Sequence, residues 1–244
     1  MSFHVIIPAR LESTRLPGKL LMELYGQSVI ERVYRQVLLA KPKSITIATD
    51  NDAIFKKAKD FGANVLMTSS THQSGTDRIA EVVAKADFLP EDIIVNVQGD
   101  EPLIAPELIV QVAASLASSS VPMATLCWPI DDEATANNPN VVKVVRDVNH
   151  LALYFSRCAI PFYRDKTVVV KHLFRHIGLY AYRAGFLLDI VKWPVSELEA
   201  AEALEQLRVL GAGFSIKVDE ACVCPLQDIN TPEDFEKIRM YLST

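Results

Sequence analysis

Three cationic side chains lie close together near the start of the chain, in the segment 8–19. Arg10, Arg15 and Lys19 follow a short apolar run, residues 5–7, which is typical of a buried strand. Guanidinium and ammonium groups, with nearby backbone N–H groups, bind phosphate oxygens well. The segment therefore predicts a triphosphate site rather than a solvated basic turn. It contains neither the GxxxxGK(S/T) loop of P-loop enzymes nor the GxGxxG pattern of dinucleotide-binding proteins.

Two further loops carry residues suited to a bound nucleotide. The segment HQSGTDR (72–78) opens an expected helix, and Ser74 with Asp77 fits a capping box. Gly75 would let a base or a phosphate approach the backbone closely. The segment QGDEP (98–102) follows the most β-like run of the chain, so Asp100 could hold Mg²⁺. Three such loops at one sheet edge predict a site more strongly than any one alone.

The elements that must position these loops alternate between strand and helix. Strands are expected at 5–7, 45–48, 65–67 and 93–97, and helices begin at Ser28 (with Glu31 as a capping box), 53, 77 and Pro106. This order requires a largely parallel sheet with right-handed crossovers and flanking helices, whose ligand sites lie at the carboxyl ends of the strands.

The second half of the chain changes character. Strands expected at 141–145, 151–155 and 177–182 have less helix between them, which indicates an inserted, partly antiparallel lobe at about 137–195. A helix over 197–210 with Ser196 and Glu199 as its capping box, a strand at 216–218 and a last helix capped by Thr231 complete the prediction. We expect a single α/β domain spanning 1–244.

Composition excludes several classes of function. Half of the 244 residues are hydrophobic, and a net charge of −5 argues against a general nucleic-acid or anionic-membrane binder. The N-terminus lacks a signal-peptide pattern, and no stretch approaches the roughly 20 apolar residues that span a bilayer. We therefore expect a soluble, cytoplasmic protein that has no membrane partner.

Neither the cysteines nor the histidines predict a zinc site. The four cysteines (Cys127, Cys158, Cys222 and Cys224) form no CxxC pair and are expected to be reduced, mostly buried thiols. His172 and His176 lie in a segment that favours a strand and lacks the HExxH pattern. The cations Arg157, Arg164 and Arg175 could pair with acidic residues or bind a substrate carboxylate, and the residues alone leave this open.

Six segments, taken together, resemble the 3-deoxy-D-manno-octulosonate (Kdo) cytidylyltransferases. They are IIPARLESTRLPGK, HQSGTDR, VNVQGDEP, ALYFSRCAIPF, FRHIGLYAYR and LEQLRVL, and they extend over almost the whole chain. The resemblance implies a Rossmann-like, nucleotide-diphospho-sugar transferase-like fold with a sugar-binding and dimerisation lobe, and a homodimer. It also implies transfer of CMP from CTP to Kdo, with release of diphosphate, for lipopolysaccharide biosynthesis.

The same resemblance implies a role for each matching residue. Arg10, Lys19 and Asp100 would be catalytic. Pro8, Ala9, Arg10, Arg15, Lys19, Ser74, Gly75, Arg78 and Gln98 would bind the nucleotide. Arg157, Arg164, His176, Tyr180, Glu205 and Gln206 would surround the sugar acid. Asp100 would bind Mg²⁺, the expected cofactor.

The sequence departs from the family pattern at two places. The family's C-terminal motif resembles VDTPED, whose first aspartate is a second metal ligand, but this chain has Asn230 there. Asp228 lies two residues earlier, on the same face of an extended segment and roughly 6.5–7 Å away, so we hypothesise that it supplies the missing charge. The linker between Arg164 and His172 is also shorter than is usual in the family, which affects the expected rim of the sugar site.

Three alternatives remain beside this reading. The same chemistry could act on another acidic sugar, such as 8-amino-Kdo or a sialic acid. A non-catalytic nucleotide-binding relative would be consistent with Asn230. An NAD-linked oxidoreductase is disfavoured because its glycine fingerprint is missing. The choice of cytosine over uracil rests on the resemblance alone.

Overall fold

The computed structural model describes residues 1–11, 15–72, 74–164 and 173–243. The first half contains β1 (His4–Ala9), η1 (Lys19–Leu21), β2 (Glu23–Leu24), β3 (Gln27–Ser28), α1 (Val29–Leu39), β4 (Ser44–Thr49), α2 (Asp52–Asp60), β5 (Val65–Met67), α3 (Gly75–Lys85), β6 (Ile93–Asn96) and α4 (Pro106–Ala117). The second half contains β7 (Met123–Pro129), α5 (Glu133–Asn137), β8 (Lys143–Arg146), β9 (Ala152–Ser156), β10 (Phe174–Arg183), α6 (Ala184–Ile190), α7 (Glu197–Glu202), α8 (Gln206–Gly211), β11 (Ile216–Glu220) and α9 (Pro232–Tyr241).

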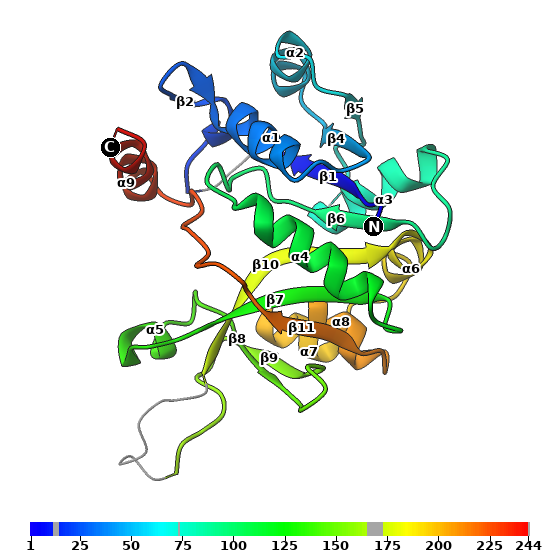
Figure 1. The fold of residues 1–244 in the computed structure, drawn as a ribbon, viewed down its shortest axis with the longest axis vertical. Coiled ribbons are helices and arrows are strands. Elements are labelled where there is room, and N and C mark those ends of the chain that lie inside the picture. Colours follow the sequence, from blue (N-terminus) through cyan, green and yellow to red (C-terminus); the bar gives the residue numbers. More distant parts are fainter. Residues whose placement is uncertain (12–14, 73, 165–172, 244) are drawn as a thin grey trace.

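One mixed sheet connects both halves of the chain (Figure 1). Strands β6, β1, β4 and β5 are parallel neighbours, as the alternating pattern predicted. Strand β10 lies antiparallel between β6 and β7, and β11 runs parallel to β7. Strands β8 and β9 continue antiparallel pairing from β10. The expected α/β class, with a mostly parallel central sheet and a small antiparallel part, is therefore confirmed.

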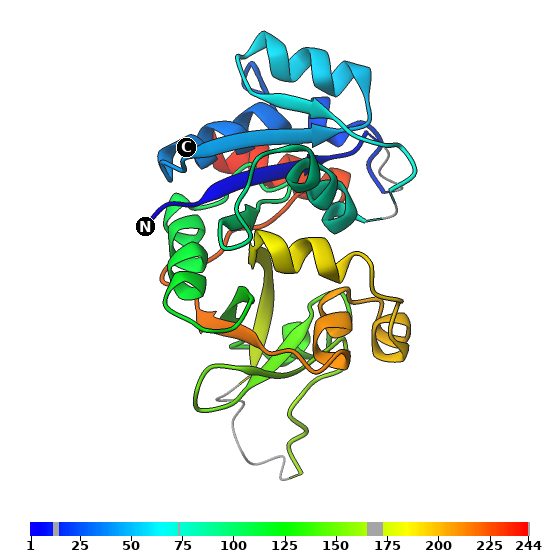
Figure 2. The ribbon, with the colours of Figure 1, turned by 90° about the vertical axis from the view of Figure 1, so that its right-hand side faces the viewer.

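The alternating side chains of β1 divide the hydrophobic core between the two faces of the sheet. Val5 and Ile7 belong to a core that includes residues of α1 and α4, whereas Ile6 belongs to a second core that includes residues of α3 and α6. Because successive side chains of a strand point to opposite faces, helices cover the sheet on both sides. Figure 2 shows α3 and α6 near one another on the second face, where they are in contact.

Polar caps begin several helices where the sequence predicted them. Ser74 and Asp77 form a complete capping box at the start of α3, and Ser196 and Glu199 form one at α7. At α1 only half of the expected box forms, because the Glu31 carboxylate binds Arg35 instead of the Ser28 backbone. These caps fix the loops that lead into the helices.

Three expectations about the second half need correction. The single helix expected over 197–210 is two short helices, because Ala203 adopts φ +50° and ends α7. Strand β7 and helix α6 were not predicted. Among the cysteines only Cys127 is buried, whereas the other three are exposed.

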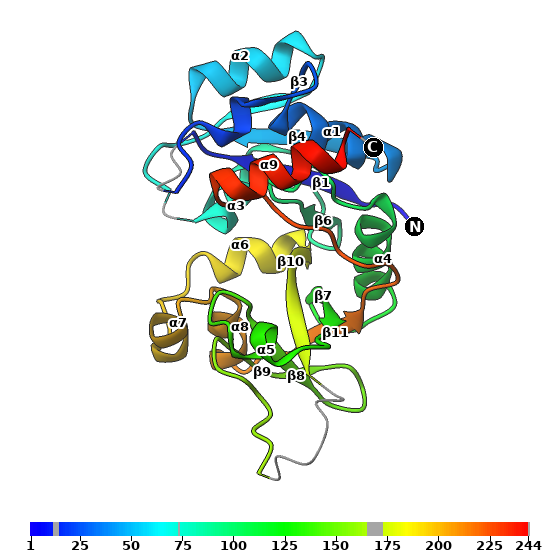
Figure 3. The ribbon, with the colours of Figure 1, turned by 90° about the vertical axis from the view of Figure 1, so that its left-hand side faces the viewer.

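The C-terminal segment crosses from one half of the molecule to the other. It leaves β11 and ends in α9, which lies near α1 in Figures 1 and 3. Ile229 is completely buried, and its N–H donates to the carbonyl of Asp100 at 2.9 Å. This crossing places Asp228 beside the loop after β6.

Two expectations about the whole chain are only partly addressed by the fold. The inserted lobe at 137–195 stays a prediction, although β10, inside that range, runs through the main sheet. The linker between Arg164 and His172, with His172 itself, lies outside the described residues. Across the described ranges, no helix has the length and apolar character needed to cross a membrane.

Candidate active site

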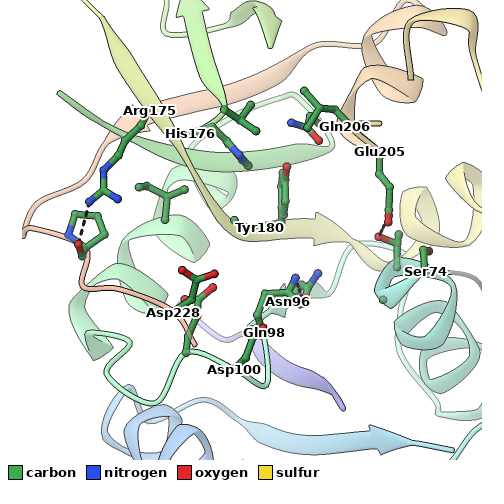
Figure 4. A pocket seen from close by; sticks show the side chains of 18 of the residues that line it. Ser74, Asn96, Gln98, Asp100, Arg175, His176, Tyr180, Glu205, Gln206 and Asp228 are labelled. Atoms are coloured by element: carbon green, nitrogen blue, oxygen red, sulfur yellow. Dashed lines mark hydrogen bonds between the residues drawn. The ribbon is translucent and has the colours of Figure 1, made fainter. Parts of the chain in front are cut away.

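A cavity of about 580 Å³ opens where the end of β6, the start of α3, strand β10 and the α7–α8 turn meet (Figure 4). Its polar lining includes Ser74, Gly75, Asn96, Gln98, Asp100, Arg175, His176, Tyr180, Glu205, Gln206 and Asp228. The cavity therefore lies beyond the carboxyl ends of parallel strands, which is where α/β sheets bind ligands. Nine of the sequence-predicted site residues contribute to this lining.

Lys19 links the loop after β1 to the loop after β6, which carries Asp100. It begins η1, and its Nζ donates to Asp100 Oδ2 at 2.5 Å and to the carbonyl of Ile229 at 2.7 Å. Gly99 permits this arrangement, since a Cβ there would lie 3.0 Å from the carbonyl oxygen of Pro8. Pro8 and Ala9 form the buried end of β1 beneath the site. The ion pair therefore depends on a close approach of two strand ends.

Arg15 and Asn230 meet beside this ion pair. Arg15 Nη2 donates to Asn230 Oδ1 at 2.7 Å, although the two residues are far apart in sequence. Arg10 follows directly after β1 and is half-buried. None of these three cations belongs to the cavity lining in the described chain, so their role as phosphate ligands stays a prediction.

Ser74 and Gly75 reach the cavity, but Arg78 lies beneath it. Arg78 is completely buried, and its guanidinium donates to Asp50 Oδ2 at 2.6 Å and to Thr68 Oγ1 at 2.5 Å. Asp50 follows β4 and Thr68 follows β5, so Arg78 fastens two strand-end loops to α3. This corrects the expectation that Arg78 faces the nucleotide: its charge is used inside the protein, because a buried cation requires paired acceptors.

Asp100 and Asp228 place two carboxylates at one end of the cavity (Figure 4). Burial, and then the negative charge of Asp100, raise the pKa of Asp228. Burial and both aspartates raise the pKa of Glu101 to about 8. Asn230 is not part of the lining in the described chain; its Nδ2 donates to Asp228 Oδ2 at 2.5 Å. The concentration of negative charge is suited to a hard cation.

The opposite end of the cavity is lined by polar side chains from β10 and from the turn between α7 and α8. Burial lowers the pKa of His176 to about 3, and its Nε2 lies 3.0 Å from Thr125 Oγ1. Burial also raises the pKa of Tyr180 and of Glu205, whose Oε2 accepts from Thr76 Oγ1 at 2.6 Å. Gln206 Nε2 is buried and meets no acceptor among the described residues, so it can donate to a ligand.

The two arginines expected at the sugar lie elsewhere. The guanidinium of Arg157 donates to backbone carbonyls behind the cavity wall, and Arg164 is exposed; neither belongs to the lining within the described ranges. Arg175 does line the cavity and donates to the carbonyl of Pro225 at 3.0 Å.

Sequence reasoning missed several lining residues. Asn96, Thr76, Tyr182 and Arg208 contribute to the cavity without belonging to any of the roles expected from sequence. Asn96 is a polar side chain at the end of an apolar strand, which was the available signal. Arg208 gave no signal, because its pairing with Glu199 at 2.6 Å depends on the turn between α7 and α8.

A cavity with two carboxylates at one end, beside the Lys19–Asp100 ion pair and at the carboxyl edge of a parallel sheet, is the arrangement expected of a nucleotide-dependent transferase. The sequence profile of the cytidylyltransferase family matches residues 4–218. The 3-deoxy-manno-octulosonate cytidylyltransferase of Legionella pneumophila (strain Paris) is 63% identical over 240 residues, covering 98% of this chain and 96% of the relative. That of Aliivibrio fischeri (strain MJ11) is 51% identical over the full length of both chains, 100% of each.

Solved structures agree with these relatives. The structure of a CMP:2-keto-3-deoxy-manno-octonic acid synthetase complexed with CTP matches with a TM-score of 0.93 and 37% identity, covering 100% of this chain and 99% of that one. A 4-diphosphocytidyl-2C-methyl-D-erythritol synthase from Anaerococcus prevotii matches with a TM-score of 0.65 at 16% identity, covering 100% and 99%, and this likeness shows the fold alone. The chain belongs to the cytidylyltransferase family, among the 3-deoxy-manno-octulosonate cytidylyltransferases, which confirms the resemblance found in the sequence.

Proposed function

We propose that this chain transfers CMP from CTP to the sugar acid Kdo, giving CMP-Kdo and diphosphate for lipopolysaccharide biosynthesis. The observation that carries the proposal is the cavity with two carboxylates at one end, next to the Lys19–Asp100 ion pair, and hydrogen-bonding side chains of β10 and of the α7–α8 turn at the other. The names of the relatives and the CTP complex of the similar structure support the choice of both substrates.

At the nucleotide end, Arg10, Arg15 and Lys19 would bind the phosphates of CTP. Ser74, Gly75 and Gln98 would contact the nucleotide from the loops after β5 and β6, and Pro8 and Ala9 would support it from the end of β1. Arg78 would act indirectly, by holding the loop before α3. The cations would offset the charge that spreads over the phosphoryl oxygens in the transition state.

Mg²⁺ fits the carboxylate end of the cavity. Asp100 and Asp228 would offer the oxygen ligands that Mg²⁺ prefers. When bound there together with CTP, Mg²⁺ would supply charge neutralisation at the phosphates. Asn230 would act through Asp228, which it orients by its hydrogen bond.

The reaction would be an in-line displacement at the α-phosphorus. The anomeric hydroxyl oxygen of the sugar would form the new bond to phosphorus and pass its proton to water, and the bond from phosphorus to the bridging oxygen would break as diphosphate leaves. Lys19, held by Asp100 and Ile229, would neutralise the phosphates through this change. The protein's contribution would then be mainly positioning and electrostatic stabilisation.

At the sugar end, His176, Tyr180, Glu205 and Gln206 would bind the hydroxyl groups and the carboxylate of the acid. Their imidazole, hydroxyl, carboxyl and amide groups can form hydrogen bonds with a polyhydroxylated ligand. The exposed Arg164 would contribute only from the rim. A homodimer and a cytoplasmic location belong to the same proposal, and so does the absence of nucleic-acid and membrane partners.

The test is diphosphate release from CTP in the presence of Kdo and Mg²⁺, with UTP and a sialic acid as controls. Release only with CTP and Kdo is expected. Release with another acidic sugar instead, such as 8-amino-Kdo, would keep the chemistry and change the substrate. CTP binding without release from any sugar would favour a non-catalytic relative and overturn the proposal.

A further inference from the structure

A completely buried lysine lies behind the sugar end of the cavity. Lys143 begins β8, and its Nζ donates to the carbonyl oxygens of Asn138 at 2.9 Å, Val141 at 2.6 Å and Arg157 at 2.6 Å. An ammonium group has three N–H donors, so all of them are used. A buried charge is tolerated only with such complete hydrogen bonding, and burial accordingly lowers the pKa of Lys143. The lysine thereby ties the loop before β8 to the end of β9.

Arg157 continues this connection to α7. Its Nε donates to the carbonyl of Glu202 at 2.7 Å, Nη2 to that of Ala203 at 3.3 Å, and Nη1 to that of Pro139 at 3.0 Å. Each of the three guanidinium nitrogens thus has a backbone acceptor. The side chain fixes the last carbonyls of α7, a position that favours cations.

Glu202, at the end of α7, binds back to the end of β9. Its carboxylate accepts from the backbone N–H of Arg157 at 2.9 Å and from Ser156 Oγ at 2.6 Å. These hydrogen bonds lower the pKa of Glu202, although burial opposes them. Lys143, Arg157 and Glu202 together are called the wall linkage below.

The wall linkage holds two parts of the cavity lining. On one side is the loop 140–142, whose three residues line the cavity. On the other side is Ala203, held at φ +50°, where α7 ends and the chain turns so that Glu205 and Gln206 reach the cavity. A non-glycine residue in this conformation is strained and persists only where its surroundings hold it. The hydrogen bonds from Arg157 to both sides of that turn provide the support.

We propose that Lys143, Arg157 and Glu202 are positioning residues that set the enzyme's use of the sugar acid without contacting it. The inference rests on the proposed function for the identity of that ligand. The nucleotide end is built from other elements: Lys19 in η1, Asp100 after β6 and Ser74 before α3. A change in the wall linkage should therefore weaken recognition of the sugar and leave CTP binding intact.

The experiment compares Arg157→Ala, Glu202→Ala and their double variant with the intact chain. The measurements are kcat/KM for Kdo at saturating CTP, and the Kd of CTP. We expect each single variant to lower kcat/KM for Kdo roughly ten- to a hundredfold, because a displaced wall misaligns the substrate. The double variant should be little worse than either single one, because both changes act through the same turn. The Kd of CTP should not change.

Control variants separate this role from general stability. Arg183 also donates to backbone carbonyls, those of Glu91 and Leu116, but lies outside the cavity lining in the described chain. Arg183→Ala should therefore leave kcat/KM for Kdo unchanged. Glu202→Gln keeps the volume of the side chain but removes its charge. It should lower kcat/KM for Kdo without changing the Kd of CTP. This variant tests the wall linkage if Arg157→Ala does not fold.

Two results would overturn the inference. If Arg157→Ala impairs the use of Kdo while both Glu202 variants do not, Arg157 contacts the sugar itself. If all variants weaken CTP binding and the use of Kdo equally, or if they change neither, the wall linkage has no positioning role. If the unaltered protein releases no diphosphate, the proposed function is wrong, but the wall linkage can still be tested. The Kd of Kdo would then be measured for the same variants.

Discussion

The side-chain amide of Asn230 lies between a carboxylate and a guanidinium. Its Nδ2 donates to Asp228 Oδ2 at 2.5 Å, and its Oδ1 accepts from Arg15 Nη2 at 2.7 Å. An amide presents donors on one side and an acceptor on the other, so the two charged neighbours fix its orientation. The negative charge at this end of the cavity consequently comes from Asp228 and Asp100, and position 230 serves to hold Asp228.

We predict that Asp228→Asn raises the Mg²⁺ concentration needed for half-maximal activity and lowers kcat roughly 10²–10³-fold, the usual cost of losing one electrostatic contact in the transition state. Asn230→Ala should have a smaller effect, since it removes a hydrogen bond but no charge. The measurement is kcat as a function of Mg²⁺ concentration for both variants. Unchanged Mg²⁺ dependence in Asp228→Asn would show that Asp228 is no metal ligand.

Lys19→Met tests the phosphate end separately. Because Lys19 Nζ is the cation paired with Asp100, its loss should lower kcat roughly 10²–10³-fold while the protein stays folded. Lys57→Met is a matched control, since Lys57 pairs with Glu23 at 3.5 Å on the surface. Circular dichroism checks folding, and diphosphate release measures activity. Normal turnover by Lys19→Met would remove this lysine from the mechanism.

The sequence could predict the strand-end loops because their signals are local. The capping box of Ser74 and Asp77, the glycine before Asp100 and the cations after β1 each lie within one short segment. The rule that parallel strands align their carboxyl ends then brought the loops together. Asp228 was found in the same way, from its spacing to Asn230 in an extended segment.

The remaining features depend on contacts between distant residues. Arg78 was expected at the nucleotide, and Lys143 was not singled out, because the acceptors that let these two side chains be buried come from other segments. The break at Ala203 carries no glycine to mark it, and it is held by Arg157, which directly follows β9. Periodicity within 197–210 therefore predicted one helix where tertiary hydrogen bonds make two.

The buried ion pair of Arg78 gives a prediction about stability. Arg78→Met leaves Asp50 and Thr68 without their partner, and breaking such a pair typically costs about 3–5 kcal/mol of the free energy of unfolding. Arg239→Met is the control, because Arg239 and Glu236 form an exposed pair one helical turn apart, typically worth about 0.2–0.5 kcal/mol. Urea unfolding measures both. Equal losses for the two variants would contradict the role assigned to Arg78.

The hydrogen bonds of His176 fix its protonation. Thr125 Oγ1 lies 2.9 Å from the carbonyl oxygens of both Ile177 and Leu179, so its single proton is donated to a carbonyl. The hydroxyl oxygen then accepts from His176 Nε2–H, which leaves Nδ1 as the acceptor of a neutral ring. This arrangement agrees with the lowered pKa of His176.

His176 should therefore contribute to the pH dependence of stability. Its pKa falls from 6.5 to about 3 on folding, so below pH 6.5 the unfolded chain takes up a proton that the folded protein rejects. The contribution is complete above pH 6.5 and is lost as the pH falls towards 3, with a slope of up to about 1.4 kcal/mol per pH unit. We predict that His176→Gln, which retains a hydrogen-bonding side chain, flattens the fall in the free energy of unfolding over this interval. Urea unfolding of both proteins at several pH values measures the difference, and parallel curves would show that His176 is protonated in the folded protein as readily as in the unfolded chain.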